Sequence, residues 1–209
     1  MKVVCLTSGG IDSFVMSTML KEKGMEIYPL FINYGQLAYE REYKSYLKVC
    51  KYLKVEPKTI DISNFGKFIT SGITSKDLNV VDDAFLPNRN LLFLILASSY
   101  AYQNEIYQVA IGIIENPIFS DQEETFLQAA EKCLKESLDV DINLLYPIKK
   151  LNKLDIYKLA YKLKLPLDII YYCHRGGTEP CNECLACQEH VRAREQIKKI
   201  EEAGEIDWT

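Results

Sequence analysis

Hydrophobic residues recur along the chain with two different periods. Short apolar runs predict strands, and apolar positions three or four residues apart predict helices. The predicted strands are 2–7, 26–33, 58–62, 106–113 and 143–148, and the predicted helices are 11–23, 38–54, 89–103, 122–138 and 153–164. Residues 64–87 follow neither period and predict a loop. This alternation predicts an α/β fold with a doubly wound, mostly parallel sheet.

Two further features refine the predicted organisation. The helix at 89–103 is apolar all round, which predicts that it packs deep against the sheet. From about Pro166 the pattern changes to a cysteine-rich loop and a charged helix at 188–203. We therefore expect an α/β domain over 1–165 and a C-terminal segment over 166–209 packed on it. A ligand is expected beyond the carboxyl ends of the parallel strands.

Composition narrows the classes of partner. The formal net charge is −4 and basic residues are scattered, so the charge pattern does not favour a nucleic-acid partner. The sequence contains no run of about 18 apolar residues, so no membrane span is predicted. The N-terminus lacks the pattern of a secretory signal, which favours the cytoplasm.

The stretch "TSGGIDS", residues 7–13, joins the first predicted strand to the first helix. Glycines allow a tight turn, and backbone N–H groups at a helix N-terminus bind anions. The candidate phosphate ligands are Ser8, Gly9, Gly10, Asp12 and Ser13. Neither the Walker pattern nor G-x-G-x-x-G is present. The alternative is an ordinary turn in which Asp12 or Ser13 serves the helix N-terminus.

Four of the seven cysteines lie within fifteen residues. Their spacing, C-x7-C-x2-C-x2-C, predicts a metal site formed by Cys173, Cys181, Cys184 and Cys187. Zinc in a closed structural site is the first interpretation, ahead of an iron–sulfur cluster and of a cluster without metal.

Other cysteines and both histidines have simpler interpretations. Cys5, Cys50 and Cys133 lie in apolar segments and are predicted to be buried as small hydrophobic residues. His174 and His190 flank the cysteine cluster as substitute ligands or as ordinary polar residues.

The S-G-G-x-D-S loop resembles that of the N-type ATP pyrophosphatases, or PP-loop proteins. "SGGIDS", "FINYGQ", "LPNRNLLFL", "AIGI" and "CNECLAC" together resemble the 7-cyano-7-deazaguanine synthase (QueC) family over nearly the whole chain. The resemblance implies an adenine nucleotide alpha hydrolase-like, Rossmann-like fold. It also implies an ATP-dependent ligase of queuosine biosynthesis, which adenylates 7-carboxy-7-deazaguanine and condenses it with ammonia. A structural zinc ion and a homodimer are further implications.

The resemblance also implies residue roles. Ser8, Gly9, Gly10, Asp12 and Ser13 would hold ATP, with Asp12 orienting Mg²⁺ or the loop. Arg89 and Lys153 would neutralise phosphate charge, whereas Tyr34, Gly35 and Gln36 would lie near the adenine or the substrate base. As alternatives, Arg89 caps or solvates its helix, Lys153 pairs with an acid on a solvated face, and Tyr34 only packs.

Two positions depart from the family's usual pattern. Asn33 stands where the family usually has an aspartate. After "AIGI", the shorter segment "IENPIFSDQEETF" replaces a stretch like S-G-Y-P-D-C-R and lacks its arginine. Glu115, Ser120 and Asp121 are the candidates for recognising a purine-like edge. We expect segment 115–126 to determine the acceptor, with a larger amine, such as a protein amine, as the alternative to ammonia.

Two rival functions remain open at the level of sequence. A tRNA-thiolating ATP pyrophosphatase would predict a cationic face and an added RNA-binding domain, neither of which is evident. A non-catalytic ATP-binding module would bind nucleotide without turnover. Release of AMP and pyrophosphate would distinguish an enzyme from such a module.

Overall fold

The computed structural model describes residues 1–116 and 118–203. Residue 117 of the divergent segment and residues 204–209 of the predicted C-terminal segment lie outside this description. The strands are β1 (Lys2–Leu6), β2 (Glu26–Asn33), β3 (Lys58–Asp61), β4 (Gln108–Ala110) and β5 (Asn143–Leu145). The helices are α1 (Ile11–Glu22), α2 (Tyr39–Leu53), α3 (Phe65–Phe68), α4 (Arg89–Gln103), η1 (Ser120–Gln122), α5 (Glu124–Leu138), α6 (Lys153–Lys162) and α7 (Leu185–Glu202).

The five strands form one sheet in the order β3-β2-β1-β4-β5, and every pairing is parallel. The chain moves outward from β1 to β2 and β3, and then returns to the other side of β1 for β4. β1 and β4 therefore flank the topological switch point, where doubly wound folds bind ligands. The prediction of a doubly wound parallel sheet is confirmed, although β4 and β5 are shorter than predicted.

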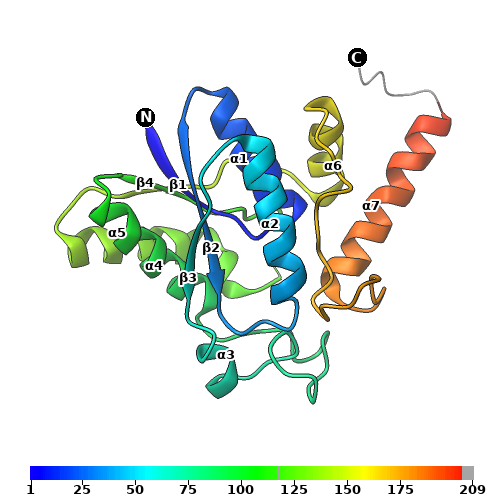
Figure 1. Cartoon of the computed structure of the whole chain (residues 1–209), viewed down its shortest axis with the longest axis horizontal. Helices are drawn as coiled ribbons and strands as arrows, with labels where there is room; N and C mark the ends of the chain where they lie inside the picture. Colours follow the sequence, from blue (N-terminus) through cyan, green and yellow to red (C-terminus); the bar gives the residue numbers. More distant parts are fainter. Residues whose placement is uncertain (117, 204–209) are drawn as a thin grey trace.

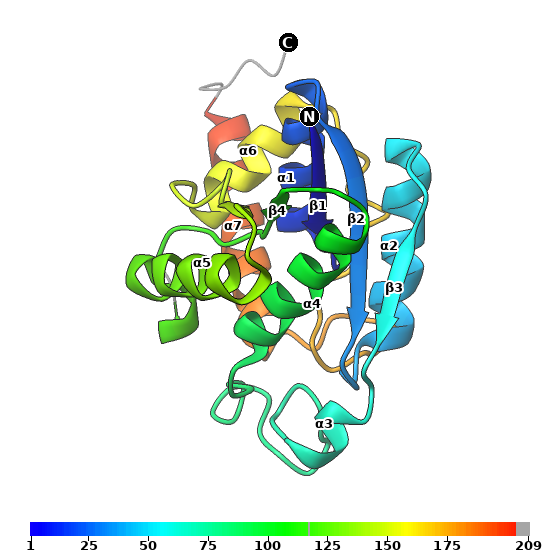
Figure 2. The same ribbon diagram turned by 90° about the vertical axis from the view of Figure 1, so that its left-hand side faces the viewer.

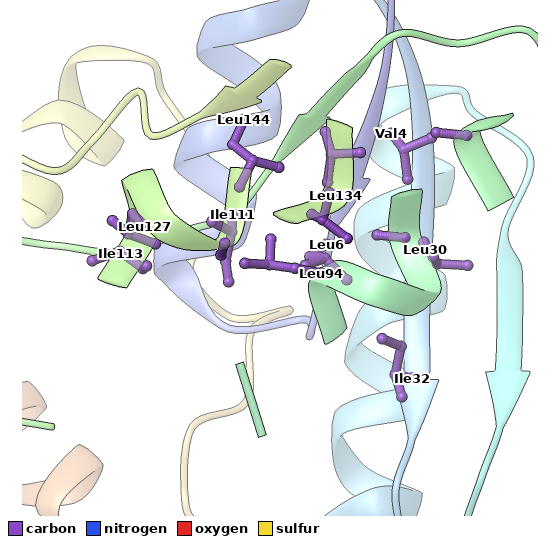
Figure 3. Packing of buried hydrophobic residues seen from close by; sticks show 14 of the residues in the cluster. Val4, Leu6, Leu30, Ile32, Leu94, Ile111, Ile113, Leu127, Leu134 and Leu144 are labelled. Carbon is purple, nitrogen blue, oxygen red and sulfur yellow. The ribbon is translucent and has the colours of Figure 1, made fainter. Parts of the chain in front are cut away.

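Helices cover both faces of this sheet (Figures 1 and 2). On one face, Val4 and Leu6 of β1 point toward Leu94 of α4 and Leu134 of α5, as the close view shows (Figure 3). On the other face, Val3 and Cys5 of β1 join the hydrophobic cluster that contains residues of α1, α2, α6 and α7. Successive residues of β1 thus serve opposite faces, as the twofold period of a strand requires.

The helix α4 corrects one expectation. Leu94, Ala97 and Ala101 are fully buried against the sheet, but Ile95 and Tyr102 are 43% and 46% exposed. The apolar sequence of this helix therefore serves a buried face and an exposed face. Its depth in the fold was overestimated because an all-round apolar pattern does not say what covers each side.

Two smaller expectations are also corrected. The predicted loop at 64–87 contains the single-turn helix α3. Cys5 and Cys50 are buried as expected, whereas Cys133 is exposed on α5. Cys133 is about 100° around the helix axis from the buried Leu134, at the edge of the buried face. Within the described residues, no helix combines the length and apolar character needed to span a membrane.

The C-terminal segment packs on the α/β core. Figure 1 shows α7 (orange to red) running beside α6. Ala193 and Ile197 of α7 are buried in the same cluster as Ile156 and Ala160 of α6. The helix begins at Leu185, three residues before the predicted start, because Cys184 caps it: the Cys187 N–H donates to the Cys184 sulfur. α7 thereby shares the hydrophobic core of the preceding residues.

Candidate functional site

The loop between β1 and α1 leaves the N-terminus of α1 open. Gly10 is the N-cap, and no side chain accepts a hydrogen bond from the first turn. Ser13 Oγ donates to Gly10 O instead, and the backbone N–H groups of Ser8 and Gly10 donate to serine hydroxyls within the loop. The first N–H groups of a helix lack intrahelical partners, so this end can bind an anion. The turn therefore differs from a capped one in leaving the first N–H groups of α1 without a side-chain acceptor.

Gly9 is required by the backbone itself. Its φ is +82°, and a Cβ there would lie 2.6 Å from the Tyr46 amide nitrogen and 2.7 Å from the Glu42 carbonyl oxygen. The carbonyl of Gly9 accepts a hydrogen bond from the Tyr171 N–H and lies 2.6 Å from Ser45 Oγ. The loop is therefore held from α2 on one side and from residue 171 of the C-terminal segment on the other.

A cavity of about 330 Å³ opens in front of this loop. Its walls are the ends of β1, β2 and β4, the first residues of α4, and the C-terminal segment. It contains most of the predicted nucleotide ligands, namely Ser8, Gly10, Asp12, Ser13, Tyr34, Gln36, Arg89 and Lys153. Gly9 and Gly35 are not in its lining, and both are turn residues with positive φ. The cavity lies beyond the carboxyl ends of the strands, where a ligand was expected.

Lys153 lies between two carboxylates. Its Nζ is 2.7 Å and 2.9 Å from the two oxygens of Asp12 and 3.4 Å from Oε2 of Glu189. The lysine begins α6, where the helix dipole disfavours a cation, so the carboxylates stabilise it there. Burial opposes the charged form, but Asp12 and Glu189 outweigh this and raise the pKa of Lys153. The lysine is paired, as the plainer interpretation supposed, but inside the cavity and not on a solvated face.

Arg89 interacts electrostatically with Glu42 and Tyr34. Burial raises the pKa of Glu42, against the effects of the Gln36 amide, which donates to this carboxylate at 3.0 Å, and of Arg89. Burial also raises the pKa of Tyr34, and Arg89 opposes that shift. The ring centroids of Tyr34 and Phe93 are 5.3 Å apart, and Tyr34 also lines the cavity. The same side chain therefore packs in the core and faces the cavity.

The departure at Asn33 has a local explanation. Asn33 at the end of β2 faces Asp61 at the end of β3, and its Nδ2 donates to Asp61 Oδ2 at 2.8 Å. Its Oδ1 accepts from the Gly35 N–H. An aspartate at position 33 would place two carboxylates in contact. The asparagine therefore matches an acid on the neighbouring strand.

The divergent segment reaches the cavity through other residues than those predicted. Glu115 and Ser120 are exposed, and Asp121 is buried beneath α4, where its carboxylate accepts from the Asn90 N–H at 3.3 Å. None of the three is in the cavity lining, whereas Asn116, Ile118, Phe119 and Gln122 are. The part of the segment that faces the site is consequently more apolar than the sequence suggested.

The four clustered cysteines converge at the start of α7. Their sulfur atoms all lie within 4.8 Å of one another, and His174 and His190 are outside the set. Tetrahedral coordination at about 2.3 Å requires sulfur atoms roughly 3.8 Å apart, so the four fit one ion. Burial disfavours the thiolate form of Cys181. The backbone N–H groups of Cys184 and Glu183 stabilise that form and lower the pKa of Cys181 to about 7.

Both histidines line the cavity. His190 Nδ1 lies 2.5 Å from the Tyr157 hydroxyl, and its ring stacks on Tyr172 at 3.8 Å. Burial lowers the pKa of His174 to about 4, with Arg89 and Lys153 acting in the same direction. Beside the cysteine cluster, His190 is thus a buried wall residue and His174 a half-buried one.

Two acidic residues of the site were missed from the sequence. Glu42 and Glu189 both line the cavity, and both lie on amphipathic helices rich in other acids. Glu189 follows Cys187, a predicted metal ligand, by two residues, which was a usable signal. For Glu42, nothing in the local pattern separated it from its neighbour Glu40.

Comparisons with known proteins agree with this geometry. The profile of the family described as "Queuosine biosynthesis protein QueC" matches residues 2–198. The chain is 33% identical over 201 residues to "7-cyano-7-deazaguanine synthase 1" of Desulfitobacterium hafniense, covering 92% of this chain and 90% of that protein. It is 31% identical to "7-cyano-7-deazaguanine synthase" of Caldicellulosiruptor saccharolyticus, with coverages of 100% and 98%.

A solved structure shares the fold. The NH3-dependent NAD synthetase of Campylobacter jejuni superimposes with a TM-score of 0.51 at 21% identity, covering 99% of this chain and 79% of that one. At this identity the likeness supports the fold alone. The match to the family profile, in contrast, covers nearly the whole chain and includes both the phosphate loop and the cysteine cluster. The chain therefore belongs to the QueC family of queuosine biosynthesis proteins.

Proposed function

We propose that this protein is an ATP-dependent carbon–nitrogen ligase that converts 7-carboxy-7-deazaguanine and ammonia to 7-cyano-7-deazaguanine. The observation that carries the proposal is the open N-terminus of α1 facing Asp12, Lys153 and Arg89 within one cavity of a QueC-family chain. A glycine loop without a Walker lysine suits attack at the α-phosphorus, which yields an acyl adenylate and pyrophosphate.

The oxygen balance sets the stoichiometry. A carboxylate carries two oxygen atoms and a nitrile carries none. Adenylation transfers one carboxylate oxygen to AMP when ammonia displaces the nucleotide, and this gives an amide. A second adenylation of the amide oxygen, followed by loss of AMP and protons, gives the nitrile. The proposal therefore requires two AMP and two pyrophosphate per nitrile.

The residues of the cavity fit the roles of this reaction. The N–H groups of the loop and of the first turn of α1 would bind phosphate oxygens, and Arg89 and Lys153 would stabilise the charge on the leaving pyrophosphate. Asp12 is the proposed ligand of Mg²⁺, which would neutralise further phosphate charge. Tyr34 and Gln36 would lie beside the adenine or the substrate base.

The four cysteines are the proposed ligands of one structural zinc ion. Four thiolates fill a tetrahedral shell and leave no open position for substrate. A single ion suits their close sulfur spacing better than a four-iron cluster, which occupies more space between its cysteines.

The alternatives differ in their support, and none is better supported than the synthase reaction. The relatives that match over most of the chain carry the synthase name, and the matching profile is that of QueC, which disfavours a tRNA-thiolating role. A larger amine as acceptor is favoured by one observation, the apolar character of Ile118 and Phe119 where the divergent segment lines the cavity.

Location and assembly belong to the same proposal. The proposed location is the cytoplasm. The proposed homodimer is supported by the exposed apolar residues Ile95 and Tyr102 on α4, which a second copy could cover. Size measurement of the protein in solution tests the dimer.

Mass spectrometry of the products tests the activity. ATP, Mg²⁺ and 7-carboxy-7-deazaguanine should give AMP and pyrophosphate, and added ammonium should give the nitrile with two AMP for each. Formation of ADP and phosphate without AMP would contradict the proposed chemistry. AMP formation that stops at the amide or at another adduct would favour the larger-amine alternative. AMP from a different carboxylate only would show that the substrate differs.

A further inference from the structure

We propose that Glu189, on the metal-binding helix α7, is a positioning residue for Lys153 and thereby determines how tightly the site holds ATP. The inference rests on the proposed function in one respect, namely that the cavity binds ATP. No role in the site was expected for Glu189, which is not part of the phosphate loop.

The contacts point to this role. Lys153 Nζ is bonded to both oxygens of Asp12, and Glu189 Oε2 approaches from the other helix at 3.4 Å. The lysine side chain is only 12% exposed, so water screens these charges weakly. A lysine in this position has to leave Asp12, at least in part, to reach a phosphate oxygen. With Glu189 in place, it keeps one carboxylate partner while doing so.

Removing Glu189 changes this balance. Lys153 would then have Asp12 as its single carboxylate partner. The ion pair between them would keep both Lys153 and Asp12 away from the nucleotide. Binding of ATP would have to break the only ion pair of a buried ammonium, which is costly. Repulsion between Glu189 and phosphate acts in the opposite direction, and the inference is that losing the second partner of Lys153 outweighs it. The loss of Glu189 should therefore weaken ATP binding.

The metal-binding segment fixes the position of this carboxylate. Glu189 lies two residues after Cys187 and five after Cys184, the N-cap of α7. The same helix turns place Leu185, Ala186 and His190 in the cavity wall. The cysteine cluster thus holds the helix turn that carries the second partner of Lys153.

A double-mutant cycle on ATP affinity tests the inference. Calorimetry with Mg²⁺ and ATP, without the carboxylate substrate, is done on wild type, Glu189→Ala, Lys153→Met and the double variant. We expect Glu189→Ala to raise the ATP dissociation constant by roughly fivefold or more, and to add little in the Lys153→Met background. Glu189→Gln, whose amide oxygen still accepts a hydrogen bond, should lie between wild type and Glu189→Ala. Glu195→Gln is the matched control, since Glu195 is exposed on the same helix.

The outcomes are separable from those of the proposed function. Equal ATP affinity in wild type and Glu189→Ala, or full additivity with Lys153→Met, would overturn the inference. Loss of metal or of melting temperature in Glu189→Ala, measured by elemental analysis and thermal unfolding, would show a merely structural role and overturn it as well. Wild-type protein that binds ATP but forms no AMP from 7-carboxy-7-deazaguanine would refute the proposed reaction, and the cycle would still decide on Glu189. Wild-type protein that binds no ATP would overturn both.

Discussion

The glycine loop, which is the proposed phosphate loop, and the cysteine-rich segment, which is the proposed metal-binding segment, line the same cavity by different means. The loop, residues 7–13, contributes serine hydroxyls and an open helix N-terminus, arranged by residues that are neighbours in sequence. The segment from 171 to 190 contributes side chains, and their positions depend on how α7 packs on α6. The first kind of site is local and the second is tertiary. Substitutions should accordingly affect the two regions in different ways.

The largest effect is expected when the metal-binding segment loses a ligand. Cys184→Ser keeps a hydroxyl that can cap α7, because serine is a good N-cap, but it removes one thiolate. We expect the unfolding free energy to fall by more than about 4 kcal/mol, since loss of a metal belongs to the severe class. Thermal unfolding and elemental analysis measure this.

Cys133→Ser is the matched control for that variant, because Cys133 is exposed and outside the cluster. It should leave the zinc content and the melting temperature unchanged. Unaltered stability of Cys184→Ser would mean that the segment is held by its packing on α6 alone.

The loop at residues 7–13 should be sensitive to a substitution that its backbone conformation cannot accommodate. Gly9→Ala places a Cβ against the backbone of α2 and adds the strain of positive φ, so we expect a loss of about 3 kcal/mol in stability. Gly24→Ala is the control, because Gly24 has φ +80° but nothing within 4 Å of the added carbon. It should cost only the strain, about 1 kcal/mol. Equal losses in the two variants, measured by denaturant unfolding, would show that the close contact is unimportant.

Asp12 joins the two regions and should separate activity from stability. Asp12→Ala removes the carboxylate nearest to Lys153 but leaves Glu189 as the partner of the lysine, so the fold should be retained. We expect AMP formation to fall by about 100-fold or more, which corresponds to about 2.7 kcal/mol of transition-state stabilisation. A folded variant with unchanged AMP formation would remove Asp12 from the mechanism.

The smallest effect is expected outside both regions. The Ser63 N–H, together with the Asn33 amide, lowers the pKa of Asp61, so this contribution to stability is present above the unfolded pKa and is lost as the pH falls. Asn33→Asp replaces the donor with a second carboxylate and should lower the melting temperature at pH 7. The deficit should shrink below about pH 4, where carboxylates become protonated.

Asn33→Ala is the control for this pH dependence, because it removes the donor without adding charge. Its deficit should also shrink at low pH, but it should be smaller at pH 7 than that of Asn33→Asp. A deficit of Asn33→Asp that does not change with pH would contradict charge repulsion as its cause.

The local pattern predicted much of the fold. The order of strands and helices, the first glycine loop and a cavity beyond the strand ends all followed from periodicity and from parallel topology. The exposure of Ile95 and Cys133 did not, because burial depends on which element covers a helix face. The resemblance of separate motifs to one family supplied the chemistry that periodicity cannot provide.

What the sequence determined by itself is what depends on near neighbours: the turn at Gly9, the open start of α1 and the cysteine spacing that brings four sulfurs together. The tertiary structure alone decided which distant charges meet. Glu189 reaches Lys153, and Lys153 reaches Asp12, although the lysine lies 141 residues from the aspartate along the chain. Many exposed acids share the local pattern of Glu189. Only the packing of α7 on α6, and of α6 on α1, brings this one to the buried ammonium, where Coulomb energy is large because water is excluded.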